Sequence, residues 1–396
     1  MVESDPRSGS PRLLVLGAGP AQLGLLEAAQ ARGVWTAVVD RDPGAPGFGL
    51  AGRRCILSTE DEPAIERLVG ALQIDGIVSP GTDWPVSVAA RVASHAGLPH
   101  PISPQTAVLA TNKLRQRECL AAAGVPQPRS WVVGSDDEPP HVDGPVVVKA
   151  PDRQGQKGLT FVADPDGLGE AIETARGAAR SGLALVEELV DGPEVTVVGF
   201  SIDGFFTALT VTDRITADPP AFGVALAHVW PSSAPPGAAD VAEAAVAALG
   251  IENGPSYTQL RVGPDGPQVI EVAARLGGGH DAELVEAVLG LDLNGLALDA
   301  ALGTDLVMTH HKPLVGGAVT RFLVAPPGVL QRVEVPEGIR ARIYREPGYV
   351  FTPLRRGADR AGAVLVVAGS REEAVAQAEA AANRVRFLTA DAGALV

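Results

Sequence analysis

The chain has 396 residues, a hydrophobic content of 46% and a formal net charge of −15. This length is enough for two or three domains with their own cores, and the composition excludes a disordered or fibrous protein. The negative charge argues against nucleic acid or an anionic membrane as a partner.

Cysteine content and apolar runs indicate a cellular location. Cys55 and Cys119 are too few and too unpatterned for a disulfide framework or a metal site, which favours a reducing compartment. Residues 1–11 lack the apolar segment of a signal peptide, and no apolar run reaches the roughly 18 residues of a membrane span. We therefore expect a cytoplasmic protein whose residues 1–11 are disordered.

The first predicted unit is β-α-β, of the doubly wound α/β type. A dinucleotide fingerprint would need glycine where Gln22 stands, and Pro20 fills the turn that a pyrophosphate would approach. A structural turn is thus favoured over NAD binding, which would make the protein an oxidoreductase. The predicted elements are strand 12–16, a glycine turn over 17–24, helix 21–32 and strand 34–39.

Further β-α units follow, and the first domain is expected to end near residue 103. They comprise strand 74–78, a loop over 79–84 and helix 85–96, followed by a proline-rich exit. Ser103 can then cap a helix that has Pro104 at its first position.

Two lysines are predicted where an isolated cation is unfavourable. Asn112 can cap a helix over 113–123, which puts Lys113 in the first turn, where a cation opposes the helix dipole. Lys149 ends strand 145–149 facing inward, and a buried lysine needs a partner. A bound anion would satisfy both, although a solvated lysine is the simpler interpretation of Lys113 alone.

A basic, glycine-punctuated loop over residues 152–158 leads into strand 159–163. Such a loop can fold over phosphates, although any hairpin can carry one. The next predicted elements are helix 165–181, strand 183–187, a meander over 195–213 and helix 236–250.

Residues 256–262 and 268–274 predict a β-hairpin around a Gly/Pro turn. Side chains two apart share a face of a strand, so Gln259 and Glu271 belong to a polar face that ends in Arg275. Oxygen ligands beside a guanidinium suit Mg²⁺ bridging phosphates better than Zn²⁺. An ordinary hairpin with a surface Glu–Arg pair is the alternative.

Three glycines, 277–279, follow the hairpin and place His280 at the start of a predicted helix over 281–289. Glycines let backbone N–H groups approach an anion closely. Beyond them, His310 and His311 form a candidate metal pair. A solvated loop is favoured, because adjacent histidines point in opposite directions in a strand. The last predicted elements are strands 316–324, 339–343 and 363–367 and helix 370–385.

In order and approximate spacing, these features resemble the ATP-grasp superfamily over almost the whole chain. The resemblance is closest to its carboxylate–amine ligases, the L-amino-acid ligase, carbamoyl-phosphate-synthase-like and phosphoribosylglycinamide-synthetase-like group. The residues that carry it are Lys113, Lys149, loop 152–158, Glu187, Glu194, Gln259, Glu271 and Arg275.

The resemblance implies an α/β and α+β protein with the ATP-grasp fold, preceded by a Rossmann-like pre-ATP-grasp domain and followed by a small α+β portion. The implied limits are 12–103 for the first domain, 104–304 for the ATP-grasp domain with a flexible subdomain at about 128–190, and 305–396 for the C-terminal portion.

Carried over by position, the resemblance implies ATP and Mg²⁺ as cofactors and assigns roles to named residues. ATP would contact Lys113, Lys149, Gly155, Lys157, Gly158, Glu187, Glu188, Val190 and Glu194. Mg²⁺ would be held by Gln259 and Glu271, with Arg275 and Lys149 catalytic. The substrates would contact Gly277, Gly278, Gly279 and His280. Independently of the resemblance, residues 213–230 are expected to border the substrate pocket, because they connect the meander to helix 236–250. Arg214, His228 and Arg321 are each a candidate carboxylate ligand or a surface charge.

The implied reaction is ATP-dependent amide formation through an acyl phosphate, releasing ADP and phosphate, between a small carboxylate and an amine, with an amino acid expected among them. The resemblance also allows a homodimer. Two positions depart from the family pattern: Gln259 stands where Glu is usual, and Ala273 where Asn is usual. Because the site loses a charge and a ligand, an ATP-binding relative without ligase turnover is the alternative.

Overall fold

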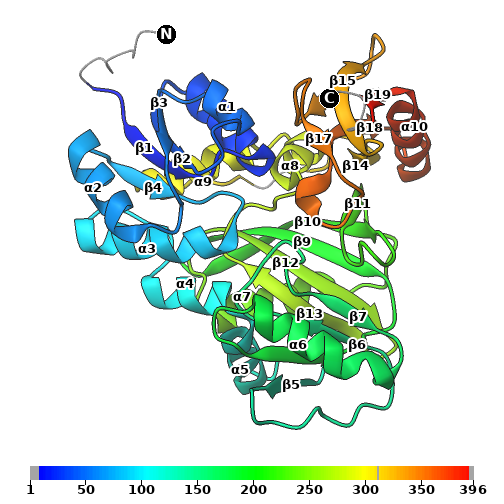
Figure 1. Ribbon diagram of the computed structural model, residues 1–396. Coiled ribbons are helices and arrows are strands. Elements are labelled where there is room, and N and C mark those ends of the chain that lie inside the picture. Colours follow the sequence, from blue (N-terminus) through cyan, green and yellow to red (C-terminus); the bar gives the residue numbers. More distant parts are fainter. Residues whose placement is uncertain (1–8, 310–311, 392–396) are drawn as a thin grey trace.

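The computed structural model describes residues 9–309 and 312–391 (Figure 1). Its N-terminal part contains a four-stranded parallel sheet in the order β3-β2-β1-β4. The elements are β1 (Arg12–Leu16), α1 (Leu23–Ala31), β2 (Trp35–Asp40), β3 (Arg53–Ile56), α2 (Glu62–Leu72), β4 (Gly76–Val78) and α3 (Asp83–Ala96).

Both faces of this sheet are covered, as the continuous apolar run of β1 predicts. Leu13 and Val15 pack in one core with α1, and Leu14 and Leu16 pack in another with α2 and α3. The predicted β-α-β unit is confirmed with one difference. The helix begins at Leu23, because Pro20–Gln22 forms a 3₁₀ turn first.

Two helices connect this part to the next layer, α4 (Pro104–Thr111) and α5 (Lys113–Ala122). Both predicted N-caps are formed: Ser103 Oγ accepts from the Thr106 N–H, and Asn112 Oδ1 accepts from the Leu114 N–H. A four-stranded sheet follows in the order β5-β8-β6-β7, with α6 packed on it. Its elements are β5 (Ser130–Val133), β6 (Val146–Lys149), β7 (Thr160–Val162), α6 (Leu168–Ala178) and β8 (Ala184–Glu188).

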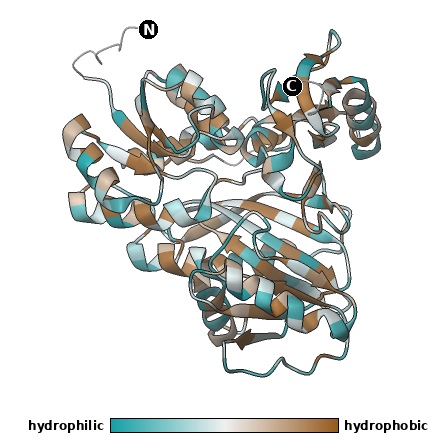
Figure 2. Cartoon of the chain, viewed as in Figure 1, coloured by the Kyte–Doolittle hydropathy of each residue, from teal (hydrophilic) through white to brown (hydrophobic). Residues whose placement is uncertain are grey.

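The largest sheet has eight strands in the order β13-β12-β9-β10-β11-β14-β18-β16. Figure 2 shows the hydrophobic residues concentrated on the strands. Its strands are β9 (Glu194–Ile202), β10 (Phe205–Thr216), β11 (Ala225–Trp230), β12 (Gly254–Gly263), β13 (Gly266–Ala273), β14 (Gly317–Leu323), β16 (Ala341–Ile343) and β18 (Gly362–Ala368). The helices around it are α7 (Ala238–Ala248), α8 (Asp281–Leu289), α9 (Leu293–Leu302) and α10 (Arg371–Arg384).

The C-terminal portion is joined to this sheet. Strand β11 pairs with β10 on one side and with β14 on the other, so hydrogen bonding continues from the hairpin into the C-terminal strands. A small second sheet, not predicted from the sequence, is added by β15 (Gly328–Glu334), β17 (Val350–Phe351) and β19 (Arg386–Ala390).

The predicted domain limits stay a prediction, and His310 and His311 lie outside the described residues. Among the helices in the described ranges, none is both long and apolar enough to cross a membrane.

A buried ion cluster ties α5 to the four-stranded sheet. Glu187, with 2% of its side chain exposed, accepts a 2.8 Å hydrogen bond from Arg117 Nε and forms an ion pair with Lys149. Burial opposes ionisation of Glu187, but the two cations outweigh it and lower its pKa to about 2. Arg117 also donates to the carbonyl oxygens of Val269 and Ile270, which extends the cluster to β13.

We expect Glu187→Gln to destabilise the fold by about 3–5 kcal/mol, because two buried cations would lose their carboxylate. The neighbouring Glu188 is exposed, and its ion pair with Arg129 is long, at 3.8 Å. The free energy of unfolding of Glu188→Gln should therefore stay within about 0.5 kcal/mol of the wild-type value. Urea unfolding of the three proteins measures the difference. Equal stability of the two variants would contradict the cluster's role.

Candidate active site

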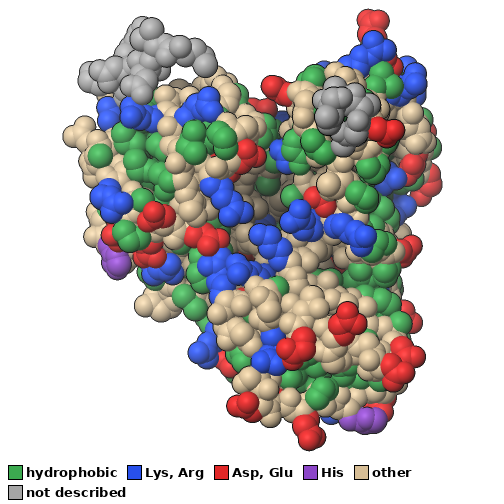
Figure 3. All heavy atoms as spheres, viewed as in Figure 1, with side chains coloured by type: hydrophobic (Ala, Val, Ile, Leu, Met, Phe, Trp, Pro, Cys, Tyr) green, Lys and Arg blue, Asp and Glu red, His purple; other side chains and the backbone are tan. Residues whose placement is uncertain are grey.

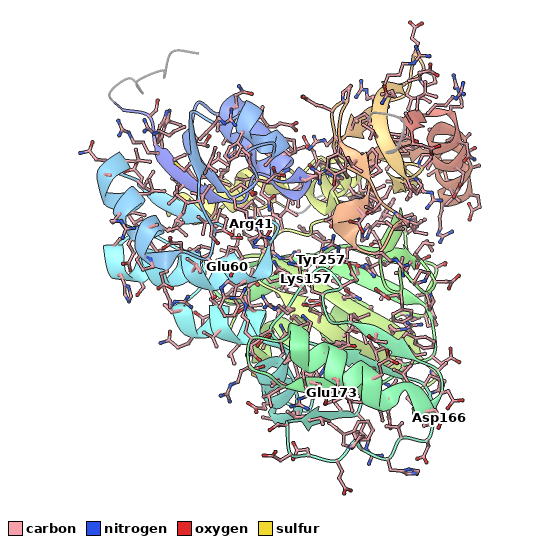
Figure 4. The ribbon with its side chains drawn as sticks, in the orientation of Figure 1. Arg41, Glu60, Lys157, Asp166, Glu173 and Tyr257 are labelled. Atoms are coloured by element: carbon pink, nitrogen blue, oxygen red, sulfur yellow. The ribbon has the colours of Figure 1, made fainter. Side chains whose placement is uncertain are left out.

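A cleft of about 400 Å³ lies between the N-terminal part, the eight-stranded sheet and the C-terminal portion. Figure 3 shows the hollow, with Lys and Arg side chains gathered around it. Tyr257 of β12 and Lys157 both lie in the central region of the molecule (Figure 4). The lining comes from residues 19–22, 81–83, 154–156, 257–279 and 344–360, with contributions from β10 and β11.

The predicted metal pair comes together on the hairpin. Gln259 of β12 stands directly opposite Glu271 of β13, and both line the cleft. Lys113 Nζ lies 2.8 Å from Glu271 Oε1, so the lysine at the start of α5 faces the hairpin. Burial and Glu271 act in opposite directions on Lys113, and its pKa is raised overall. We expected an anion beside Lys113, and in this structure the anion is the carboxylate of Glu271.

The side-chain amide of Gln259 is oriented by a hydrogen bond to Glu194. Its Nε2 donates a 2.6 Å hydrogen bond to Glu194 Oε1, and Arg214 forms an ion pair with the same carboxylate. An amide that donates through nitrogen leaves its carbonyl oxygen free for a cation. Arg214 lines the cleft as expected for a substrate contact. Glu194 is engaged by these two groups, and the role predicted for it toward ATP stays a prediction.

Arg275 joins the hairpin to the N-terminal part. Its guanidinium forms an ion pair with Asp83, at the start of α3, and its Nη1 donates to the Leu276 carbonyl oxygen at 2.8 Å. Asp83 was not predicted as a site residue. Its place after the carboxyl end of β4 is the signal that could have identified it, because ligand sites of doubly wound sheets lie beyond strand ends.

The glycine loop 152–158 contacts two other parts of the chain. Gln154 Oε1 accepts from the backbone N–H groups of Asp83, at 2.7 Å, and Trp84, at 3.2 Å. Gln156 Oε1 accepts from the Gly357 N–H at 3.2 Å. The loop therefore bridges the start of α3 and the C-terminal portion, and its residues 154–156 form part of the cleft wall.

The other residues that are predicted to contact ATP lie in this loop or near β8. Gly155 and Gly158 have φ of +65° and +67°, a backbone conformation that favours glycine. Lys157 is exposed and lines a smaller hollow next to the cleft, Val190 is buried, and Lys149 is held by Glu187. Their contacts with ATP stay predictions.

The glycines after the hairpin are closely packed against neighbouring side chains, and their contact with a substrate stays a prediction. A side chain at Gly279 would approach His228 Nε2 to 2.7 Å, and one at Gly277 would collide with Asp281. The Gly279 N–H already donates to Asp281 Oδ2 at 3.1 Å. Close packing therefore requires these glycines, while Gly278 and Gly279 still line the cleft.

His280 has a left-handed backbone, with φ of +60°, and its Nε2 shares a hydrogen bond with the Tyr344 hydroxyl. Tyr344 lines the cleft, whereas His280 lines a neighbouring groove. The histidine therefore reaches the site through Tyr344, and direct contact with a substrate stays a prediction. Tyr344 was missed because nothing in its local sequence distinguishes it.

His228 of β11 is a buried cleft residue whose Nδ1 has no hydrogen-bond partner in the described part of the chain. Burial lowers its pKa to about 4, aided by nearby arginines and opposed by Asp281. The imidazole is thus neutral near pH 7.

The lowered pKa of His228 predicts a stability loss in acid. An imidazole in the unfolded chain titrates near pH 6.5, so the unfolded state binds more protons between about pH 6.5 and 4. Folding stability should therefore fall across this window, by roughly 3 kcal/mol from this group. Urea unfolding at pH 7.5 and 4.5 should show a smaller acid loss for His228→Gln than for the wild type. His141, with 91% of its side chain exposed, supplies the control His141→Gln, and an unchanged loss in His228→Gln would contradict the assignment.

Removing the Gln154 side chain should loosen the glycine loop. Gln154→Ala deletes the acceptor for two N–H groups at the start of α3, and ~1 kcal/mol would raise the opened fraction about fivefold. Trypsin cleavage after Lys157 measures the opening. The control Gln331→Ala removes an exposed glutamine from the C-terminal sheet, and equal cleavage rates for both variants would refute the anchor.

Comparison with known proteins gives a family match within the C-terminal portion and a curated relative along most of the chain. A family model described as L-amino acid ligase C-terminal domain 2 matches residues 321–390. The uncharacterized protein y4rH of Sinorhizobium fredii is 28% identical over 357 residues, which are 82% of this chain and 72% of that protein.

Solved structures cover nearly the whole chain. The L-amino acid ligase from Bacillus licheniformis has a TM-score of 0.80 at 22% identity, over 96% of this chain and 99% of that chain. The biotin carboxylase domain of Hydrogenobacter thermophilus 2-oxoglutarate carboxylase, in complex with MgADP and bicarbonate, has a TM-score of 0.79 at 17% identity, over 95% and 90%. The expected ATP-grasp fold is confirmed, and residues 321–390 match an L-amino acid ligase domain.

Proposed function

We propose that this protein is a carboxylate–amine ligase that uses ATP to form an amide through an acyl phosphate. The observation that carries the proposal is the convergence of Gln259, Glu271 and Arg275 in one cleft, with Lys113 paired to Glu271 and the glycine loop in the cleft wall. Positive charge and oxygen ligands meet there although the whole chain is strongly acidic.

The residues of the hairpin fit a bound Mg²⁺. Glu271 offers a carboxylate, and the Gln259 carbonyl oxygen is free because its nitrogen donates to Glu194. Both are oxygen donors of the kind that Mg²⁺ prefers, with phosphate and water completing its coordination. A bound Mg²⁺ would neutralise charge on the phosphates. Ala273 lines the cleft but supplies no ligand, so we expect weaker metal binding than with an asparagine there.

The chemistry requires activation of a poor acyl donor. A carboxylate oxygen attacks the γ-phosphorus, the bond to ADP breaks, and an acyl phosphate forms. The amine nitrogen then attacks the carbonyl carbon, phosphate leaves and the nitrogen gives up a proton. Lys113 and Arg275 stabilise the charge that develops on the transferred group, and the glycine loop excludes water from the acyl phosphate.

An amino acid is the substrate class that we propose. The match of residues 321–390 to an L-amino acid ligase domain and the similarity to the Bacillus licheniformis enzyme support it. The second candidate is an ATP-binding protein without turnover. Gln259 and Ala273 favour it, because they reduce the charge and the number of ligands at the metal site.

ADP and phosphate release with Mg-ATP should appear only when particular amino acids are offered in pairs. Glu271→Gln should lower the rate at least about a hundredfold, since it removes the carboxylate that would hold Mg²⁺ and that pairs with Lys113. Coupled assays of ADP and phosphate measure both.

Glu173→Gln is the matched control and should keep full activity, because Glu173 lies on α6 with 69% of its side chain exposed. Protection by ATP without release for any pair would instead favour the binding-only candidate. In that case Gln259→Glu with Ala273→Asn should restore turnover.

A further inference from the structure

The charged groups that line the cleft are paired, with one exception. Asp83 pairs with Arg275, Glu271 with Lys113, and Arg214 with Glu194. Arg360 also lines the cleft, but no carboxylate of residues 9–309 or 312–391 lies within 4.0 Å of it. A guanidinium keeps its charge at any physiological pH, so its charge is available to a ligand.

Arg360 is held in a fixed orientation. Its guanidinium carbon lies 3.7 Å from the ring centroid of Phe322, and its Nε donates to the Gly357 carbonyl oxygen at 2.8 Å. Nη1 lies 3.5 Å from the Ala225 carbonyl oxygen, at the limit of a hydrogen bond. A planar fork stacked on an aromatic ring loses little conformational freedom when it binds a carboxylate with two nitrogens.

The surroundings of Arg360 favour an anion over water. Tyr344 and His228 line the same cleft, and His228 is neutral, so neither cancels the guanidinium charge. Burial lowers the pKa of Arg360, aided by Arg214 and opposed by Tyr344 and Asp281, because the cation is removed from water without an ion-pair partner among the described residues. A partnered carboxylate from a substrate would offset that cost.

Arg275 and Arg360 line the same cleft but come from different parts of the chain. Arg275 follows the hairpin that carries Glu271 and is anchored to Asp83 of the N-terminal part. Arg360 comes from the C-terminal portion, beside Gly357, whose N–H is bound by Gln156. The carboxylate that is phosphorylated must lie beside the hairpin, where Glu271 and Lys113 are. A second carboxylate can then lie at Arg360.

We propose that Arg360, stacked on Phe322, binds the carboxylate of the amine substrate, so that this substrate is an amino acid or another amine that carries a carboxylate. The inference rests on the proposed ligase function and assigns a role to the C-terminal portion. The match to an L-amino acid ligase domain begins at residue 321 and includes Phe322, Tyr344 and Arg360. This portion would therefore select the amine, while the hairpin activates the acyl donor.

The test compares each amine that supports ADP release with its carboxamide, which has the same side chain but no carboxylate. The wild type should favour the free acid, and Arg360→Gln should lower kcat/KM for the acid about tenfold to a hundredfold, mainly through KM. The carboxamide should be little affected. Arg360→Lys should fall between, because it keeps the charge and loses the fork.

Arg386→Gln is the control, since Arg386 lies in the same portion with 68% of its side chain exposed. Melting temperatures of all variants identify a folding defect. A wild type that uses the carboxamide as well as the acid would overturn the proposal. So would a preference for the acid that survives in Arg360→Gln.

If no pair supports ADP release, the ligase proposal fails and binding tests Arg360 separately. Thermal unfolding with Mg-ADP then compares amino acids with their carboxamides. Greater stabilisation by an acid, lost in Arg360→Gln and kept in Arg386→Gln, supports the carboxylate site. Equal stabilisation by acid and amide, or none, overturns it.

Discussion

Pairing of buried charge is the constraint on which this structure depends. A charge removed from water is costly unless an opposite charge and hydrogen bonds surround it, and this chain places several such charges between its layers. Arg117, Glu187 and Lys149 join α5 to the four-stranded sheet, and Arg275 joins the hairpin to Asp83 of the N-terminal part. The Arg275–Asp83 pair also lines the cleft.

The glycine loop links these layers, and its residues 154–156 form part of the cleft wall. Its two glutamine side chains accept from backbone N–H groups of α3 and of the C-terminal portion. Each bond is weak enough to break during a catalytic cycle, since a single hydrogen bond contributes about 1 kcal/mol. Such a loop can admit ATP and then exclude water, which a reactive acyl phosphate requires.

The hairpin pairs a carboxylate with a lysine, but one of its two expected metal ligands is neutral. Glu271 and Lys113 keep a carboxylate and a cation beside the expected phosphates, while Gln259 supplies a neutral oxygen. Glu194 and Arg214 orient that amide, so the substitution is built into a hydrogen-bonded network. With one charge fewer at Gln259 and one ligand fewer at Ala273, the proposed site would bind Mg²⁺ more weakly.

Local patterns in the sequence determined much of this protein. The apolar run of β1, the caps at Ser103 and Asn112, and the alternation in the hairpin depend on neighbours along the chain, so they could be predicted. What they could not show was which distant groups meet. Tyr344 and Arg360 have no distinctive local pattern, and only the folded sheets bring them to the cleft. Arg117 likewise meets Glu187 only in the folded chain. The sequence likewise did not show that the C-terminal strands join the sheet of the hairpin. Strand β11 pairs with β14, and such pairing joins segments that are far apart in sequence.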